Sequence, residues 1–115
     1  MITIYHNPRC SKSRNALEAI RKSEKEFDVI EYLVDLFTEE SLRTLIEKLN
    51  IKAEELVRKN ESVFVENFKG KSYTDSEWIK ILVENPKLIQ RPIVVTNTRA
   101  GVARDEQTIE IILKD

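Results

Sequence analysis

Two extended segments separated by a helical one open the chain, and this order limits the possible folds more than any other feature. Residues 1–5 alternate in polarity as a short strand does, and residues 27–33 have the composition of a second strand. Between them, Ala16, Leu17 and Ile20 fall on one face of a helix. Two strands joined through a helix usually lie parallel with a right-handed crossover, so we expect the chain to begin with a βαβ unit.

The middle of the chain is expected to be mainly helical. Thr38 is a favourable N-cap for a helix whose leucine and isoleucine residues recur at helical spacing. Residues 51–59 are typical of a shorter helix, whereas residues 62–71 fit more than one secondary structure. Thr74 starts a capping-box pattern ahead of another helix, which should end before Pro86.

The last third of the chain predicts two strands and a helix. Residues 93–96 form a short apolar run typical of a buried strand, and residues 99–104 are expected to pair with it as a hairpin. Asp105 is a suitable N-cap for a final helix. The order βαβ, several helices and then ββα predicts an α/β fold with a mixed sheet. We expect residues 1–115 to form a single domain with a helical insertion at about residues 38–86.

Composition argues against a membrane protein, a secreted protein and a nucleic-acid-binding protein. The 115 residues, of which 41% are apolar, fit one small domain with its own core. No apolar run approaches the roughly 20 residues of a membrane span, and the N-terminus lacks the pattern of a signal peptide. The net charge of -1 provides no general attraction for nucleic acid. We therefore expect a cytoplasmic protein without membrane or nucleic-acid partners.

Cys10 is the only cysteine of the chain, so it cannot form an internal disulfide. It falls at or just before the predicted start of the first helix, where unpaired N–H groups and the helix dipole favour an anion. Arg9, Lys12 and Arg14 add positive charge within one turn. Because the thiolate is the reactive form of cysteine, we expect Cys10 to be a nucleophile rather than a small buried apolar residue.

His6 is the only histidine, and a predicted turn at Asn7-Pro8 separates it from Cys10. An imidazolium at this position would support the thiolate by its charge, and a neutral ring could position the thiol by a hydrogen bond. A purely structural histidine is the third interpretation. We favour an assisting role and leave its form open.

Three arginines occupy the ends of predicted elements. Arg58 is expected to end a helix, Arg91 to precede Pro92 at the start of a strand, and Arg104 to close the last strand. Each alone would be an ordinary solvent-exposed residue. Together with a thiolate they suggest an anion pocket, since the planar guanidinium matches paired oxyanion oxygens.

Three segments resemble the glutaredoxin-dependent arsenate reductase family, which is related to Spx-type proteins. They are residues 6–15, His-Asn-Pro-Arg-Cys-Ser-Lys-Ser-Arg-Asn; residues 56–60, Leu-Val-Arg-Lys-Asn; and residues 90–95, Gln-Arg-Pro-Ile-Val-Val. The resemblance extends over almost the whole chain. Asp105 departs from the family pattern, in which a proline is expected after the last arginine.

The resemblance implies a thioredoxin-like fold and a set of site residues. Cys10 would be the nucleophile and His6 the residue that assists it, and Pro92 would be the cis-proline of thioredoxin-like folds. The substrate-binding residues would be Arg58, Arg91, Arg104, Ser13 and Arg14.

The implied reaction is the reduction of arsenate to arsenite, a step of arsenic detoxification. Cys10 would attack arsenic and expel an oxygen as water, giving a thioarsenate held by the arginines. Glutathione would act as co-substrate by adding next, arsenic would be reduced, and glutaredoxin would regenerate the thiol. The resemblance implies neither a bound cofactor nor a metal.

Two other classes of protein stay open. Spx-type transcription regulators share the scaffold and bind RNA polymerase, but those that sense redox state use a Cys-x-x-Cys pair, and Ser13 stands at the second position here. A glutathione-dependent thiol oxidoreductase would need Cys10 without needing three convergent arginines.

Overall fold

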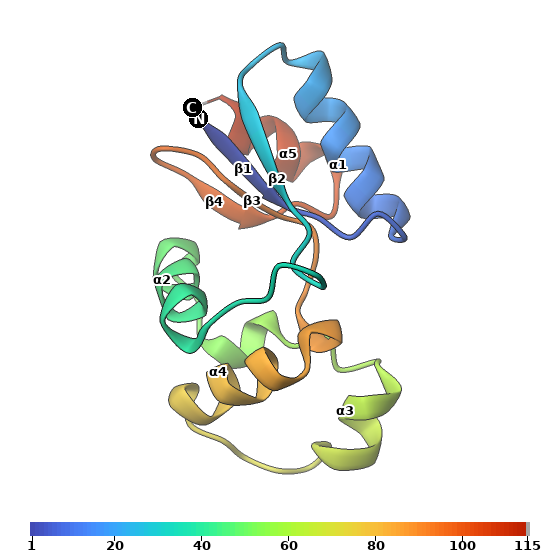
Figure 1. Ribbon diagram of the computed structural model, residues 1–115, viewed down its shortest axis with the longest axis vertical. Coiled ribbons are helices and arrows are strands. Elements are labelled where there is room, and N and C mark those ends of the chain that lie inside the picture. Colours follow the sequence, from blue (N-terminus) through green and yellow to red (C-terminus); the bar gives the residue numbers. More distant parts are fainter. Residues whose placement is uncertain (115) are drawn as a thin grey trace. The chain divides into compact units, whose positions relative to one another are not determined.

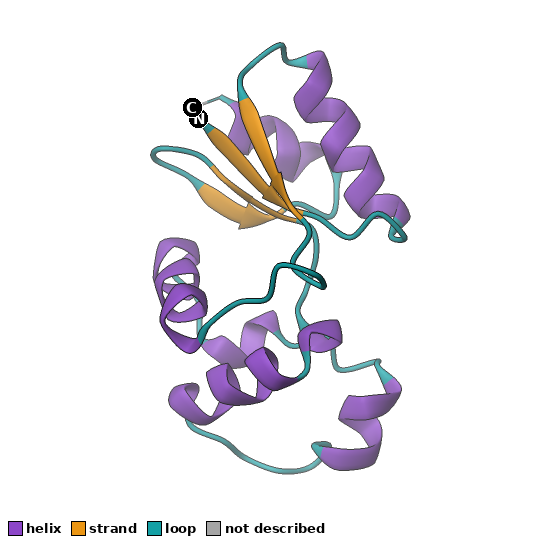
Figure 2. Cartoon of the chain, in the orientation of Figure 1, coloured by secondary structure: helices purple, strands orange, loops and turns teal. Residues whose placement is uncertain are grey.

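A computed structural model describes residues 1–114, which form two compact units. The sheet unit consists of Met1–Asp35 and the segment that starts at Arg91, and the helical unit consists of Leu36–Gln90 (Figure 1). All strands belong to the sheet unit, as Figure 2 shows. Within the described residues, no helix has the length and apolar character needed to cross a membrane.

The sheet has four strands in the order β2-β1-β3-β4. Strand β1 lies parallel to β2, and β3 is antiparallel to both β1 and β4. The chain passes from β1 to β2 through helix α1, so the predicted βαβ unit and mixed sheet are confirmed. The bounds are β1 (Ile2–Tyr5), α1 (Ser11–Lys22), β2 (Phe27–Ile30), β3 (Ile93–Val95) and β4 (Ala100–Val102).

Helix α5 (Glu106–Leu113) completes the sheet unit, and α1 and α5 share one apolar core. Ile4 of β1 pairs with Val94 of β3, and both are buried in the cluster that holds Ile20 of α1 and Ile109 of α5. Both helices therefore cover the same face of the sheet. Asp105 caps α5 as predicted, because its carboxylate accepts the N–H of Thr108 at 2.7 Å.

The helical unit contains three α-helices and two 3-10 turns. Thr38 and Thr74 cap α2 and α4 through complete capping boxes, which confirms both predicted helix starts. The elements are α2 (Glu39–Leu49), η1 (Ala53–Leu56), α3 (Ser62–Asn67), α4 (Asp75–Glu84) and η2 (Pro86–Leu88).

An aromatic cluster fixes the segment whose secondary structure the sequence left ambiguous. Residues 62–71 begin with α3 and end as irregular chain. Phe64 and Phe68 place their rings 6.3 and 6.4 Å from that of Trp78 in α4, and the ring of Tyr73 meets Trp78 edge-on at 4.9 Å. Burial of these rings, rather than local propensity, orders this part of the chain.

Several predicted elements are shorter in the structure, including the last strand, which covers Ala100–Val102 rather than residues 99–104, so that Arg104 lies beyond its end. The second strand ends at Ile30 instead of reaching residue 33, because the chain turns there and the N–H of Val34 donates to the carbonyl of Glu31. The predicted helix over residues 51–59 is reduced to η1. Val57 is extended and forms an antiparallel bridge with Ile89.

The prediction that Arg58 ends a helix is therefore wrong. Its N–H donates to the carbonyl of Leu88 at 2.7 Å, and the N–H of Gln90 donates to the carbonyl of Leu56 at 2.8 Å. This pairing with a distant segment supplies the backbone hydrogen bonds that a longer helix would otherwise provide.

Candidate active site

One edge of the sheet collects the predicted site residues of the sheet unit. Tyr5 at the end of β1 lies opposite Ile93 at the start of β3, and Ile93 lies opposite Val102 at the end of β4. The loop after β1, which leads to Cys10, therefore leaves from the edge where Arg91 precedes β3 and Arg104 follows β4. In Figure 1 this edge is the lower end of the sheet, beside the first turn of α1.

Two hydrogen bonds confirm that these segments meet. The N–H of Ala103 donates to the carbonyl of Pro92 at 2.8 Å, which extends the pairing of β3 with β4 toward the two arginines. Lys12 in the first turn of α1 donates from Nζ to the carbonyl oxygen of Arg104 at 3.3 Å. The Arg91–Pro92 peptide bond is cis.

A tight turn at residues 7–10 places Cys10 at the start of α1. The carbonyl of Asn7 accepts the N–H of Cys10 at 3.0 Å, and the Asn7 side-chain oxygen accepts the N–H of Arg9 at 3.0 Å. Cys10 is the N-cap residue, as predicted, with an extended backbone and a half-buried side chain. Its thiol makes no capping hydrogen bond. The turn predicted at Asn7-Pro8 is thereby confirmed, and the structure adds that both the side chain and the carbonyl of Asn7 hold it.

The start of α1 favours an anion. The first N–H groups of a helix have no partner within the helix, and the dipole places positive charge there. α2, α4 and α5 carry acidic residues in their first turns, whereas α1 has none. Arg14 donates from its guanidinium to the carbonyl of Pro8 at 2.9 Å and so braces the turn before Cys10.

His6 and Ser13 form a buried pair behind this turn. Nδ1 of His6 lies 2.6 Å from Oγ of Ser13, and the N–H of Asn7 donates to the same Oγ at 3.0 Å. Oγ of Ser13 therefore links the ring of His6 to the backbone of Asn7. Ser13 is completely buried, and His6 is 6% exposed.

The charge of His6 follows from this environment. Burial lowers the pKa of His6 below its ordinary value of 6.5; Glu31 opposes this shift, and Arg21 and Arg14 add to it. The ring is therefore neutral at pH 7. Of the roles left open by the sequence, the geometry supports a neutral hydrogen-bonded histidine rather than an imidazolium.

Arg58 lies in the helical unit and makes an ion pair that sequence reasoning missed. Its Nη1 donates to Oε1 of Glu61 at 2.7 Å, and its side chain is only 14% exposed. An acidic residue three positions after an arginine was the available signal, although such pairs are common on protein surfaces.

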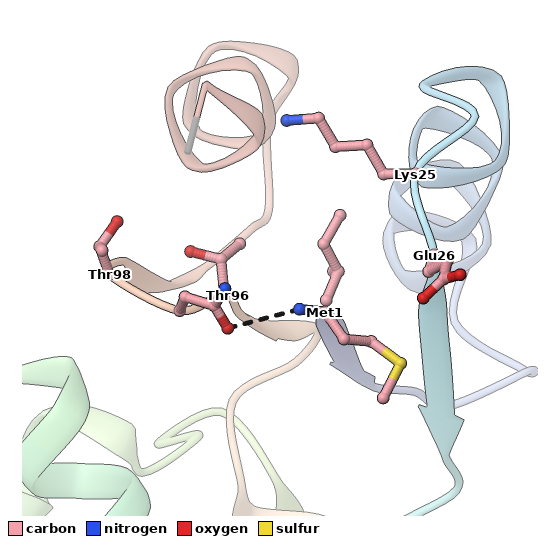
Figure 3. A pocket seen from close by; sticks show the side chains of 7 residues that line it. Met1, Lys25, Glu26, Thr96 and Thr98 are labelled. Atoms are coloured by element: carbon pink, nitrogen blue, oxygen red, sulfur yellow. Dashed lines mark hydrogen bonds between the residues drawn. The ribbon is translucent and has the colours of Figure 1, made fainter.

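The sheet unit also contains two hollows, of which the second is lined partly by Lys12 and Arg104. One, of about 480 Å³, is at the opposite end of the strands, where the N-terminal amine donates to Asn97 at 3.3 Å (Figure 3). The other, of about 630 Å³, runs between α1 and α5 from Lys12 and Arg104 to Leu113. Neither is lined by Cys10. Among residues 1–114, no group of three His, Cys, Asp or Glu side chains is placed to hold a metal.

Comparison with known proteins gives consistent matches. Residues 5–112 match the ArsC family. The arsenate reductase of Escherichia coli (strain K12) is 40% identical over 115 residues, which cover 99% of this chain and 82% of the relative. The uncharacterized protein YfgD of the same strain is also 40% identical, over 114 residues that cover 96% of each chain.

A solved structure agrees with these matches. The arsenate reductase from Vibrio cholerae has a TM-score of 0.86 at 35% identity and covers 98% of this chain and 95% of its own. The predicted thioredoxin-like fold and the resemblance noted in the sequence are thereby confirmed. The chain belongs to the ArsC family.

Proposed function

We propose that this protein is an arsenate reductase that converts arsenate to arsenite. The observation that carries the proposal is the position of Cys10 at the N-cap of α1, on the sheet edge that also holds Arg91 and Arg104. Relatives in the same family carry the name arsenate reductase at 40% identity.

The first chemical step uses Cys10 as a nucleophile. Its thiolate attacks arsenic, so that a sulfur–arsenic bond forms and one arsenic–oxygen bond breaks, and the oxygen leaves as water after taking up protons. Arg91, Arg104 and the first N–H groups of α1 would hold the negative charge of the thioarsenate. Preformed donors of this kind need no rearrangement when the charge develops.

The second step needs electrons from outside the chain. Reduction of arsenic from As(V) to As(III) takes two electrons, which two thiols supply when they become one disulfide. Cys10 is the only cysteine, so the chain cannot form that disulfide alone. Glutathione, as co-substrate, would displace a second oxygen from arsenic as water, and the glutaredoxin thiol would then attack the glutathione sulfur. A glutathione–glutaredoxin disulfide would form, two electrons would pass to arsenic, and water would release arsenite from the Cys10 sulfur and restore the thiol.

The remaining residues take different parts in the proposal. Ser13 is fully buried and hydrogen-bonded to His6 and Asn7, so we assign it to positioning the turn rather than to direct substrate contact. His6 would act through this same hydrogen bond. Arg58 would be a further anion ligand from the helical unit.

A comparison of substrates tests the proposal. Purified protein with glutathione and glutaredoxin is given either arsenate or a small mixed disulfide, and release of arsenite or of the reduced thiol is measured. We expect arsenite release that disappears in Cys10→Ser. Turnover of the disulfide without any arsenite release would support the thiol oxidoreductase instead.

A further inference from the structure

Glu61 forms an ion pair with Arg58, which the proposed function makes an anion ligand. Its Oε1 lies 2.7 Å from Nη1 of Arg58, and the exposed fractions of the two side chains are 33% and 14%. A second ion pair of the same length, Lys59 with Glu54, lies nearby in the sequence but is more than half exposed on both sides. Burial strengthens a charge pair, so the pair of Arg58 is the more strongly coupled of the two.

The side chain of Glu61 pairs with Arg58 and does not cap a helix. Glu61 is the N-cap residue of α3, yet its side chain makes no capping hydrogen bond. Its N–H donates to the carbonyl of Arg58 at 3.4 Å, and the N–H of Arg58 is held by Leu88 at 2.7 Å. Hydrogen bonds thus hold the backbone at both residues, and the Glu61 carboxylate pairs with the Arg58 guanidinium.

We propose that Glu61 weakens the non-covalent binding of tetrahedral oxyanions by partly neutralising Arg58. This inference rests on the proposed function, in which Arg58 is an anion ligand. An oxyanion that approaches Arg58 must share the guanidinium with a carboxylate or displace it, and the like charges repel.

The weakening applies to arsenate and phosphate alike. The two anions have the same shape and charge, so arginines attract both, and partial neutralisation of Arg58 lowers both affinities by a similar factor. Glu61 thus sets the strength of oxyanion binding at Arg58, and the thiol chemistry, which only arsenate undergoes, distinguishes the two anions.

Binding of inorganic phosphate tests the proposal. We expect Glu61→Gln to bind phosphate about fivefold more tightly than the unchanged protein in calorimetry at low salt, and to be inhibited by correspondingly less phosphate in the arsenate assay at arsenate concentrations well below KM. The gain should shrink at high salt, because ions screen the interaction. Glu54→Gln removes the same charge from the exposed pair and should change the phosphate Kd by less than about 1.5-fold.

The outcomes separate the inference from the proposed function. Unchanged or weaker phosphate binding by Glu61→Gln, with circular dichroism showing an intact fold, would overturn the role of Glu61, even if Arg58→Ala weakens binding as the proposed function requires. Equal gains in Glu61→Gln and Glu54→Gln would overturn it too, since they would show a general charge effect. If Arg58→Ala binds phosphate as well as the unchanged protein, Arg58 is no anion ligand, and both assignments fail.

Discussion

Ser13 connects the helix that begins after Cys10 to the strand that precedes it. Its hydroxyl joins His6, which follows β1, to the N–H of Asn7 in the turn. A buried hydrogen bond of this kind contributes about 1 kcal/mol, and loss of one partner leaves a buried polar group at a cost of about 1 to 3 kcal/mol. The shape of the turn before Cys10 therefore depends on the buried hydrogen bonds that Ser13 makes to His6 and Asn7.

The buried His6 should make stability depend on pH. Its pKa is lowered in the folded chain, so the unfolded chain takes up a proton first as pH falls below about 6.5. Urea unfolding at pH 7.0 and 5.5 should show a smaller free energy of unfolding at pH 5.5, by up to about 1.4 kcal/mol per pH unit.

A histidine-free variant is the control for this pH dependence. Glu77 and Asp105 also have lowered pKa values, but their effects are lost only below the ordinary carboxylate range. His6→Gln should therefore be less stable at pH 7 yet nearly insensitive to pH between 7.0 and 5.5. If His6→Gln retains the full pH dependence, the buried imidazole is not its source.

At the scale of elements, three strand ends and one helix start build the site of the sheet unit. The ends of β1 and β4 and the start of β3 share one edge, so Arg91 and Arg104 lie there because of strand register, despite being far from Cys10 in sequence. The N-terminus of α1 adds its dipole to the same edge.

Substitution of either edge arginine should impair catalysis. Removal of one preformed donor to a developing anion typically lowers the rate by about 100- to 1000-fold, and we expect this loss in steady-state arsenate reduction by Arg91→Ala and Arg104→Ala. Arg99→Ala is a matched control, because Arg99 binds the carbonyl of Ile111 in α5. Losses under about threefold in both edge variants would argue against an arginine site.

The sequence predicted the elements that carry their own local signals. Three helix starts were predicted from N-cap residues whose side chains accept hydrogen bonds from the first turn. The structure confirms all three, at Thr38, Thr74 and Asp105. Cys10 was placed correctly for the same reason. The sequence predicted a longer helix in place of η1, because η1 ends where Val57 pairs with Ile89, a residue far away in the sequence.

The interactions of the site were harder to predict than its residues. The neutral state of His6 depends on burial, which packing decides, and not on its neighbours in sequence. The pair of Arg58 with Glu61 required the geometry of the chain between them. The sequence thus indicated candidate site residues, whereas their hydrogen bonds and ion pairs became visible only in the folded structure.

At the scale of the whole molecule, the chain has one cysteine, whereas the proposed reduction consumes two thiols. Cys10, Arg91 and Arg104 belong to the sheet unit, and Arg58 belongs to the helical unit. Since the chain has no second cysteine, we expect turnover to depend on an external thiol. The choice of reductant therefore distinguishes this account from one in which a disulfide is shuttled within the chain.

The most direct measurement is arsenite release under different reductants. The account predicts sustained release with glutathione and glutaredoxin, none with thioredoxin alone, and none from Cys10→Ser under any condition. Mass spectrometry after oxidation with glutathione should show at most one adduct per chain, on Cys10. Sustained release with thioredoxin and no small thiol would contradict the assigned reductant, and arsenite release by Cys10→Ser would contradict the central role of Cys10.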